Sequence, residues 1–360
     1  MPSRARGSSR LAELALALGA TALAFGALEI ALRVFDVRSA SYHAIGGFTV
    51  YDPELGWRLA PSREVTFRGA HFAVHVSQNA EGLRDRHYGY AREPGRSRIL
   101  VLGDSFVWCW GVELADCFTE RLEAALPATD VVNAGVPAWS TAQELLFYER
   151  EGRRYAPDLV LLVFVANDPW ENVAGPGPHF TLAGDRLVPP ARVASRRKTR
   201  IGEWLQARSR VWQELGYLVT VAQQLLRPGT PSLERIGTAL TARPASAAQG
   251  EPVRPDRLLT EALLDRLAAD VHRDGARFAI VLEKAPRPMA AWLHDFAAGR
   301  AIPLLDLGPV LSAAEAGGEK VRLTGDPHLA SAGQEVVARE VLGFVTREGL
   351  LAPTPRSVSR

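Results

Sequence analysis

One serine in the chain has the surroundings of a catalytic nucleophile. Residues 99–105 read Ile-Leu-Val-Leu-Gly-Asp-Ser, an apolar, strand-like run that stops at Gly103 and is followed closely by Ser105. A serine at the point where a strand passes into a helix lies at the carboxyl edge of a sheet, where the reactive groups of α/β proteins usually gather. A serine hydroxyl is inert by itself, so this prediction depends on the groups that the rest of the chain supplies.

Three later motifs supply the groups that acyl transfer requires, in the order Asn133-Ala134-Gly135, Asn167-Asp168 and Asp326-Pro327-His328. The imidazole of His328 can take the serine proton near neutral pH, and Asp326 can fix the tautomer of that ring. The Ser105 N–H, the Gly135 N–H and the Asn167 amide are candidate donors to an oxyanion. The sequence therefore predicts a triad of Ser105, His328 and Asp326 with a three-donor oxyanion hole.

Each motif alone has a simpler explanation. Gly-Asp-Ser is more often a helix N-cap, and the two asparagine motifs are typical of tight turns. A histidine before a helix is usually a surface residue. The order of four motifs with complementary chemistry favours the catalytic interpretation, in which Asp104 and Asp168 only hold turns through hydrogen bonds. The absence of Gly-x-Ser-x-Gly around Ser105 excludes the α/β-hydrolase arrangement.

With these motifs in place, the chain resembles the SGNH (GDSL-type) hydrolases over roughly residues 96–170 and 256–347. The segments 52–57 and 79–85 are similar to the N-terminal part of membrane-tethered bacterial members. The resemblance implies a serine esterase that uses no metal and no cofactor. The chain departs from the family in one place, because many members place the acid three residues before the histidine, where this chain has Gly325.

Strand-like and helix-like segments alternate from residue 98 onwards. We expect strands near residues 98–103, 130–133, 158–165, 277–282 and 302–306, and helices near 113–126, 140–153, 256–273, 287–299 and 332–347. Such alternation predicts an α/β fold, a three-layer, flavodoxin-like, doubly wound parallel sheet of about five strands. Ligands of such sheets bind at the carboxyl ends of the strands, where Ser105, Gly135 and Asn167 all fall.

The N-terminal segment is expected to anchor the chain in a bacterial inner membrane. An apolar run over residues 11–35 follows three basic residues, Arg4, Arg6 and Arg10. Basic residues before a span predict an inside N-terminus and an exported, periplasmic body. Glu29 can pair with Arg33 one helical turn on. The alternatives are a signal peptide cleaved after Ala22-Leu23-Ala24 and, less favoured, a buried helix of a cytosolic protein.

The remaining segments suggest a division of the chain. We expect a membrane anchor at 1–36, a small β-rich module at 37–95, a hydrolase domain at 96–347 with a helical or disordered insertion at about 186–255, and a tail at 348–360. Within the insertion, apolar spacing predicts a helix over 200–226. This helix could be a lid or lean on the membrane beside the active site, but it is favoured to pack on the domain. Residues 228–255 are rich in Pro, Gly, Ser and Ala and are expected to be disordered or loosely packed.

The composition of the chain bears on which kinds of ligand and partner the protein could bind. The net charge is +2, which carries no signature of nucleic-acid binding, and His71 and His75 lie too far apart along a strand to share a metal ion. Four tryptophans near the motifs could form a sugar-binding or acyl-binding wall or belong to the core: Trp108, Trp110, Trp139 and Trp170. An exported location permits a Cys109–Cys117 disulfide, but we predict free thiols.

The motifs together indicate an extracytoplasmic serine esterase acting on an ester-bearing small molecule, lipid or glycan, and contacting the membrane through residues 11–35. The alternative enzymatic function is an O-acyltransferase or deacetylase acting on a cell-envelope glycan. The two functions differ only in whether water or a sugar hydroxyl accepts the acyl group. A non-catalytic envelope protein that kept the fold is a third hypothesis. The presence of Ser105, Asn167 and His328 together argues against it.

Overall fold

The computed structural model of the chain describes residues 5–35, 48–69, 71–175, 177–184, 186–190, 192, 205, 208–209, 211–212, 214–215 and 254–351. The chain divides into two compact units, residues 48–196 with 244–360, and residues 1–47 with 197–243. All four motifs lie in the larger unit. The division into domains that the sequence suggests remains a prediction.

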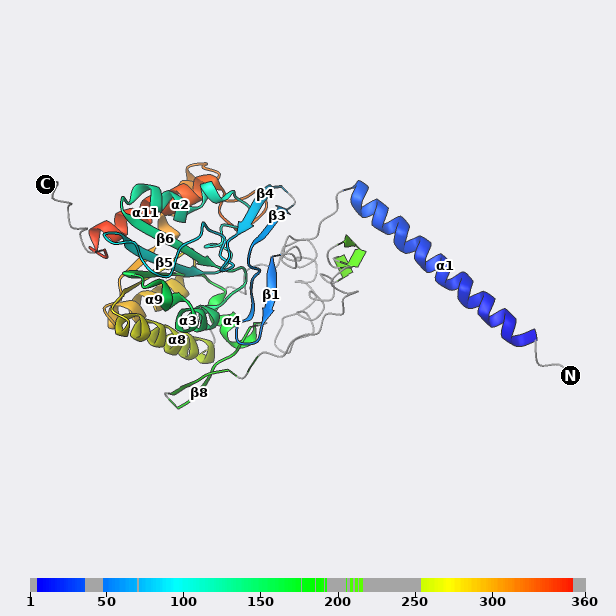
Figure 1. Cartoon of the computed structure of the whole chain (residues 1–360), viewed down its shortest axis with the longest axis horizontal. Coiled ribbons are helices and arrows are strands. Elements are labelled where there is room, and N and C mark those ends of the chain that lie inside the picture. Colours follow the sequence, from blue (N-terminus) through cyan, green and yellow to red (C-terminus); the bar gives the residue numbers. More distant parts are fainter. Residues whose placement is uncertain are drawn as a thin grey trace. The chain divides into compact units, whose positions relative to one another are not determined.

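The larger unit is built on a parallel sheet of five strands in the order β11-β10-β7-β5-β6 (Figure 1). They are β5 (Ser97–Gly103), β6 (Thr129–Gly135), β7 (Leu159–Phe164), β10 (Arg277–Leu282) and β11 (Leu304–Asp306). Every residue of β6 and β7 is buried, because helices cover both faces of the sheet and leave no solvent-facing side. The flavodoxin-like, doubly wound α/β fold predicted from the sequence is confirmed.

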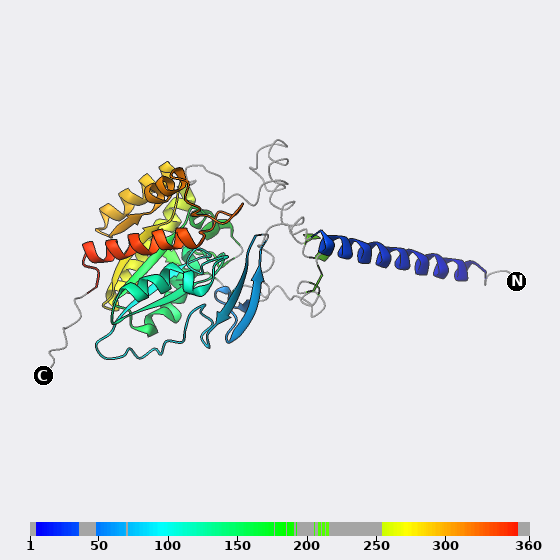
Figure 2. The same cartoon turned by 90° about the horizontal axis from the view of Figure 1, so that it is seen from above.

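Two layers of helices enclose this sheet (Figures 1 and 2). One layer holds α2 (Phe118–Ala125), α10 (Gly308–Ala316) and α11 (Ser331–Arg347), and the other holds α3 (Thr141–Arg150), α8 (Arg254–Arg273) and α9 (Arg287–Gly299). On the first face, Phe118, Leu311 and Phe344 join strand residues in one apolar cluster. On the second, Trp292 of α9 packs on Phe164 of β7. These helices match the predicted ones except for α10, for which no helix was predicted from the sequence.

Short elements complete the unit. They are η2 (Leu114–Asp116), η3 (Gly152–Tyr155), α4 (Asp168–Ala174), and a hairpin of β8 (Thr181–Ala183) and β9 (Arg186–Val188). Two antiparallel pairs precede the sheet, β1 (Thr49–Asp52) with β2 (Gly56–Leu59) and β3 (Arg63–Arg68) with β4 (Ala73–Gln78). Phe67 of β3 packs against Trp108, and the Trp57 indole N–H donates to the Pro137 carbonyl at 3.1 Å. The β-rich segment therefore packs on the segments that follow β5 and β6.

The smaller unit contains α1 (Ala5–Val34). Within Ala12–Val34, an 18-residue window reaches a mean hydropathy of 1.9, so the helix is long and apolar enough to span a membrane or to be a signal sequence. The predicted pair of Glu29 and Arg33 is confirmed at 2.7 Å. The helix predicted over 200–226 falls largely outside the described residues, and the segment 228–255 does so almost entirely.

Candidate active site

Ser105 lies two residues beyond the carboxyl end of β5, but no helix begins there. The chain instead makes successive turns, in which the Trp108 N–H donates to the Asp104 carbonyl at 3.0 Å and the Trp110 N–H to the Ser105 carbonyl at 3.1 Å. Cys109 has a φ of 59° and Gly111 a φ of 76°, left-handed values that a right-handed helix does not accommodate. The expectation that Ser105 starts a helix is therefore wrong, and α2 begins only at Phe118.

The structure brings Ser105, His328 and Asp326 into one chain of hydrogen bonds. His328 Nε2 lies 2.8 Å from Ser105 Oγ, and His328 Nδ1 lies 2.5 Å from Asp326 Oδ1. Ser105 is 5% exposed and His328 7%. A neutral imidazole with a donor at Nδ1 leaves Nε2 free to accept the hydroxyl proton. This arrangement is able to activate a serine hydroxyl.

The loop of the acid explains how an aspartate two residues before the histidine reaches the ring. The Leu323 N–H donates to the His328 carbonyl at 2.9 Å, and the Asp326 N–H donates to the Leu323 carbonyl at 3.0 Å. Gly325 has a φ of 60°, which glycine adopts without strain. This tight turn brings the Asp326 carboxylate back to the imidazole. The ring therefore has an acid beside it, although the position three residues before the histidine is a glycine, Gly325.

Aromatic rings fix the plane of the imidazole. Trp110 stacks on His328 with ring centroids 5.1 Å apart and an interplanar angle of 21°, and Phe106 lies 4.9 Å away. Trp108, Trp110 and Trp139 are each no more than 2% exposed. These three rings belong to the core and do not form an open wall for a substrate, whereas Trp170 is half-buried.

Gly135 lies where β6 approaches the turns after Ser105. A Cβ on Gly135 would lie 2.3 Å from the backbone nitrogen of Trp108, so only glycine fits. The Gly135 N–H donates to Asn133 Oδ1 at 3.0 Å, and the same side chain donates to the Val107 carbonyl at 2.8 Å. Gly135 therefore allows close packing, and its N–H is occupied within the protein in this structure.

Asn167 occupies the N-cap position of α4, three residues after the end of β7, and is half-buried; its side chain makes no capping hydrogen bond. Its neighbour Asp168 accepts a hydrogen bond from the Val165 N–H at 3.0 Å, and Asp104 accepts one from the Phe106 N–H at 2.9 Å. These bonds confirm the turn-holding roles expected of the two aspartates. They also fix the conformations of the loops that follow β5 and β7, which lie at the same edge of the sheet.

Behind these loops lies a group of enclosed carboxyls. Burial raises the pKa of Asp104, and it raises the pKa values of Glu144 and Asp168 well above their usual range, with the neighbouring carboxylates adding to the shift. Burial, with a contribution from the charge of Asp104, raises the pKa of Glu171 to about 8. Raised values keep a carboxyl neutral over more of the pH range. The region behind Ser105 therefore carries less negative charge than its composition suggests.

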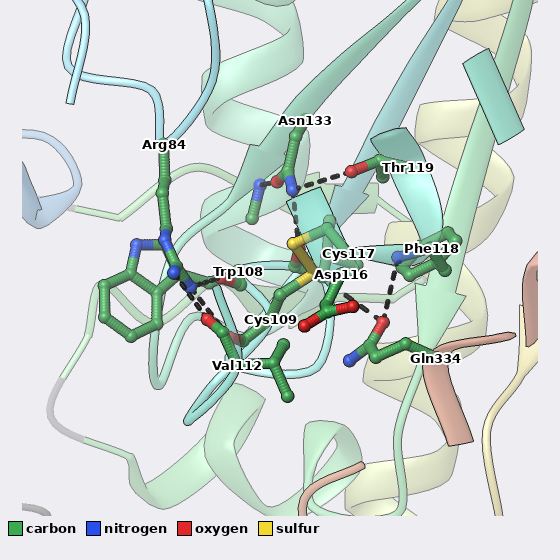
Figure 3. The surroundings of a disulfide bond; sticks show 12 residues. Arg84, Trp108, Cys109, Val112, Asp116, Cys117, Phe118, Thr119, Asn133 and Gln334 are labelled. Atoms are coloured by element: carbon green, nitrogen blue, oxygen red, sulfur yellow. Dashed lines mark hydrogen bonds between the residues drawn. A yellow bond between two sulfur atoms is a disulfide. The ribbon is translucent and has the colours of Figure 1, made fainter. Parts of the chain in front are cut away.

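Cys109 and Cys117 form a disulfide, which corrects the prediction of free thiols (Figure 3). Their Cα atoms are 5.6 Å apart, within the range that a disulfide requires, and both residues are fully buried. The left-handed conformation at Cys109 turns the chain back toward the start of α2. This conformation could not be predicted from the sequence, because cysteine is not a residue that favours it.

The sequence matches the GDSL-like lipase/acylhydrolase family over residues 101–336. A search of curated proteins gives no match. The solved structures with similarity include a lipolytic G-D-S-L family protein from Veillonella parvula, with 14% identity, a TM-score of 0.39, and coverage of 70% of this chain and 99% of that one. A lipase/acylhydrolase from Enterococcus faecalis has 14% identity and a TM-score of 0.38, with coverage of 70% and 96%. A two-domain esterase active on acetylated mannans has 12% identity and a TM-score of 0.39, with coverage of 73% and 53%.

Proposed function

Because the chain belongs to the GDSL-like lipase/acylhydrolase family, and is thereby a hydrolase acting on ester bonds, we propose that Ser105, His328 and Asp326 are its catalytic triad. The observation that supports this assignment most strongly is the hydrogen-bonded chain from Ser105 Oγ through the imidazole to Asp326 Oδ1. A protein that kept only the fold has no need of this alignment, which argues against a non-catalytic role.

The proposed reaction has two halves. Ser105 Oγ attacks the ester carbonyl carbon while its proton passes to His328 Nε2, and Asp326 stabilises the imidazolium that forms. The tetrahedral intermediate collapses when His328 protonates the departing alcohol, which leaves an acyl group on Ser105. A water molecule then attacks this acyl-enzyme with His328 as base, and the carboxylic acid departs. The enzyme returns to its starting protonation state.

We assign the oxyanion donors to the Ser105 N–H and the Asn167 side-chain amide. Gly135 can contribute only if its N–H exchanges Asn133 Oδ1 for the substrate oxygen. Asn167 lies at the carboxyl edge of the same sheet as Ser105, after the adjacent strand. A donor aimed at charge that develops in the transition state lowers the barrier more than it tightens substrate binding.

Asn167→Ala is therefore expected to lower kcat by about 10²–10³-fold, because one oxyanion donor is lost, and to change KM little. Steady-state kinetics on a short-chain ester measures both constants. Thr181→Ala serves as a control, since it truncates an exposed polar side chain of β8, which has no part in the proposed mechanism. A rise in KM with unchanged kcat would show that Asn167 binds the substrate instead.

For the location, we propose that α1 anchors the protein in the bacterial inner membrane with the catalytic unit in the periplasm. The apolar helix over Ala12–Val34 and the arginines before it support this orientation. Protease added to spheroplasts is expected to degrade the catalytic unit while leaving a cytoplasmic marker intact. Protection of the catalytic unit to the same degree as the marker would contradict the proposed topology.

The substrate class is an ester on a small molecule, lipid or envelope glycan. A series of esters of increasing acyl-chain length, tested on the purified full-length protein, distinguishes an acetyl-specific enzyme from a lipase-like one. Product analysis with a sugar present as acceptor distinguishes hydrolysis from transfer, because transfer yields an acylated sugar in place of a free acid. Hydrolysis by water is the outcome that the proposal expects.

A further inference from the structure

Arg84 lies completely buried beside the turns that follow Ser105, although it comes from the β-rich segment ahead of the sheet (Figure 3). Its guanidinium donates to three backbone carbonyls of these turns, those of Trp108 at 2.8 Å, Cys109 at 2.7 Å and Val112 at 2.6 Å. A fourth, longer bond runs to the His75 carbonyl at 3.5 Å. One side chain thus holds both ends of residues 108–112.

Such a placement is costly, because burial removes the hydration of a charged group. Burial lowers the pKa of Arg84 to about 10, against the charge of Glu113, so the side chain remains a cation at neutral pH. Its hydrogen bonds run to carbonyl oxygens, and bonds from a charged donor are stronger than neutral ones. The guanidinium carbon also lies 4.8 Å from the centre of the Trp108 ring, within the range of a cation–π contact.

The turn that carries Arg84 also reaches β6. Asp85 Oδ2 accepts a hydrogen bond from the Asn133 N–H at 2.7 Å. Asn79 Oδ1 closes the turn itself by accepting from the N–H groups of Glu81 at 3.1 Å and Leu83 at 2.8 Å. Neighbouring side chains of one turn therefore contact the turns after Ser105 and the strand that ends at Gly135.

Residues 108–112 connect directly to the reacting groups. The Trp110 N–H donates to the Ser105 carbonyl at 3.1 Å, and the Trp110 ring stacks on His328. The disulfide ties Cys109 to Cys117 at the start of α2. Arg84 restrains the same segment from the side of the β-rich segment, so a shift of this segment would move both the serine backbone and the imidazole.

We propose that Arg84 is a positioning residue for the reaction. It holds residues 108–112 so that Trp110 keeps the Ser105 hydroxyl and the His328 imidazole aligned for proton transfer. The proposal rests on the proposed catalytic role of Ser105. In this proposal the turn that carries Arg84 supports the catalytic residues. A displacement on the order of 1 Å at reacting groups can cost about 10²-fold in rate, so a support outside the site can affect catalysis strongly.

The test compares Arg84→Lys and Arg84→Gln in the full-length protein in detergent. Lysine keeps the charge without the planar fork of donors, and glutamine keeps one amide donor without the charge. Arg58→Lys is the matched control, because Arg58 of β2 donates to the Glu81 carbonyl in the same segment. The measurements are kcat, KM and the rate of inactivation by a fluorophosphonate, each normalised to the folded fraction from near-ultraviolet circular dichroism.

Both Arg84 variants are expected to lose about 10–100-fold in kcat and in inactivation rate, with KM within about twofold of wild type. Arg58→Lys should keep all three within about twofold. Unchanged rates per folded molecule in the Arg84 variants would overturn the proposal, and so would failure of both to fold, since Arg84 would then serve folding alone. Failure of the wild-type protein to react with the fluorophosphonate would contradict the proposed function instead.

Discussion

Ser105→Ala is expected to abolish ester hydrolysis, with a loss on the order of 10⁴-fold or more in kcat, because no other group in the proposed mechanism forms the acyl-enzyme. The Ser105 hydroxyl contacts His328 and lies 3.4 Å from Asp104, so its removal leaves only a small gap. The fold should therefore persist. The measurement is kcat on a short-chain ester, together with the thermal unfolding midpoint.

Ser97→Ala provides a matched control, since Ser97 lies at the amino end of the same strand, β5. It should retain wild-type activity. Hydrolysis by the Ser105 variant at more than about one hundredth of the wild-type rate would show that the nucleophile is another residue or a water molecule.

Asp326→Asn has the second largest expected effect. Asparagine removes the negative charge that stabilises the imidazolium and can present an amide donor to Nδ1, which favours the wrong tautomer. We expect kcat to fall by about 10⁴-fold, and His328→Ala to fall comparably. The double variant should be little worse than either single variant, because residues that act as a unit are not additive.

The control for this change is Asp295→Asn, which neutralises an exposed carboxylate on α9. Near-wild-type activity of Asp326→Asn would mean that Ser105 and His328 act as a dyad, with Asp326 only closing its turn. In that case the 2.5 Å contact between Asp326 and the ring would have no catalytic role.

The fold was predictable because local patterns and topology agree. Apolar runs such as Leu159–Phe164 are buried in the central sheet, and an amphipathic segment such as that of α9 covers it. Parallel strands with crossover helices leave few arrangements of the chain. Helices α4 and α10 were not predicted, because each is short and begins near a proline in a segment whose sequence is typical of a loop.

Details of the site were harder to predict, because they depend on contacts between segments far apart in the sequence. The disulfide requires a left-handed Cys109, and the burial of Trp108 and Trp110 requires the β-rich segment to cover them. The role of Arg84 depends on three carbonyls that carry no sequence signature. The order of polar motifs nevertheless identified the serine, histidine and aspartate that the fold brings together.

The most direct test of Ser105 as the nucleophile identifies the residue that a fluorophosphonate modifies. The full-length protein is treated with the reagent, digested, and analysed by mass spectrometry, with His328→Ala treated in parallel. We expect one phosphonate adduct, on Ser105, in the wild-type protein and a strongly reduced adduct in the His328 variant, because the hydroxyl is activated by the imidazole 2.8 Å away. An adduct on another residue, or ester hydrolysis that continues with Ser105 fully modified, would show that Ser105 is not the nucleophile.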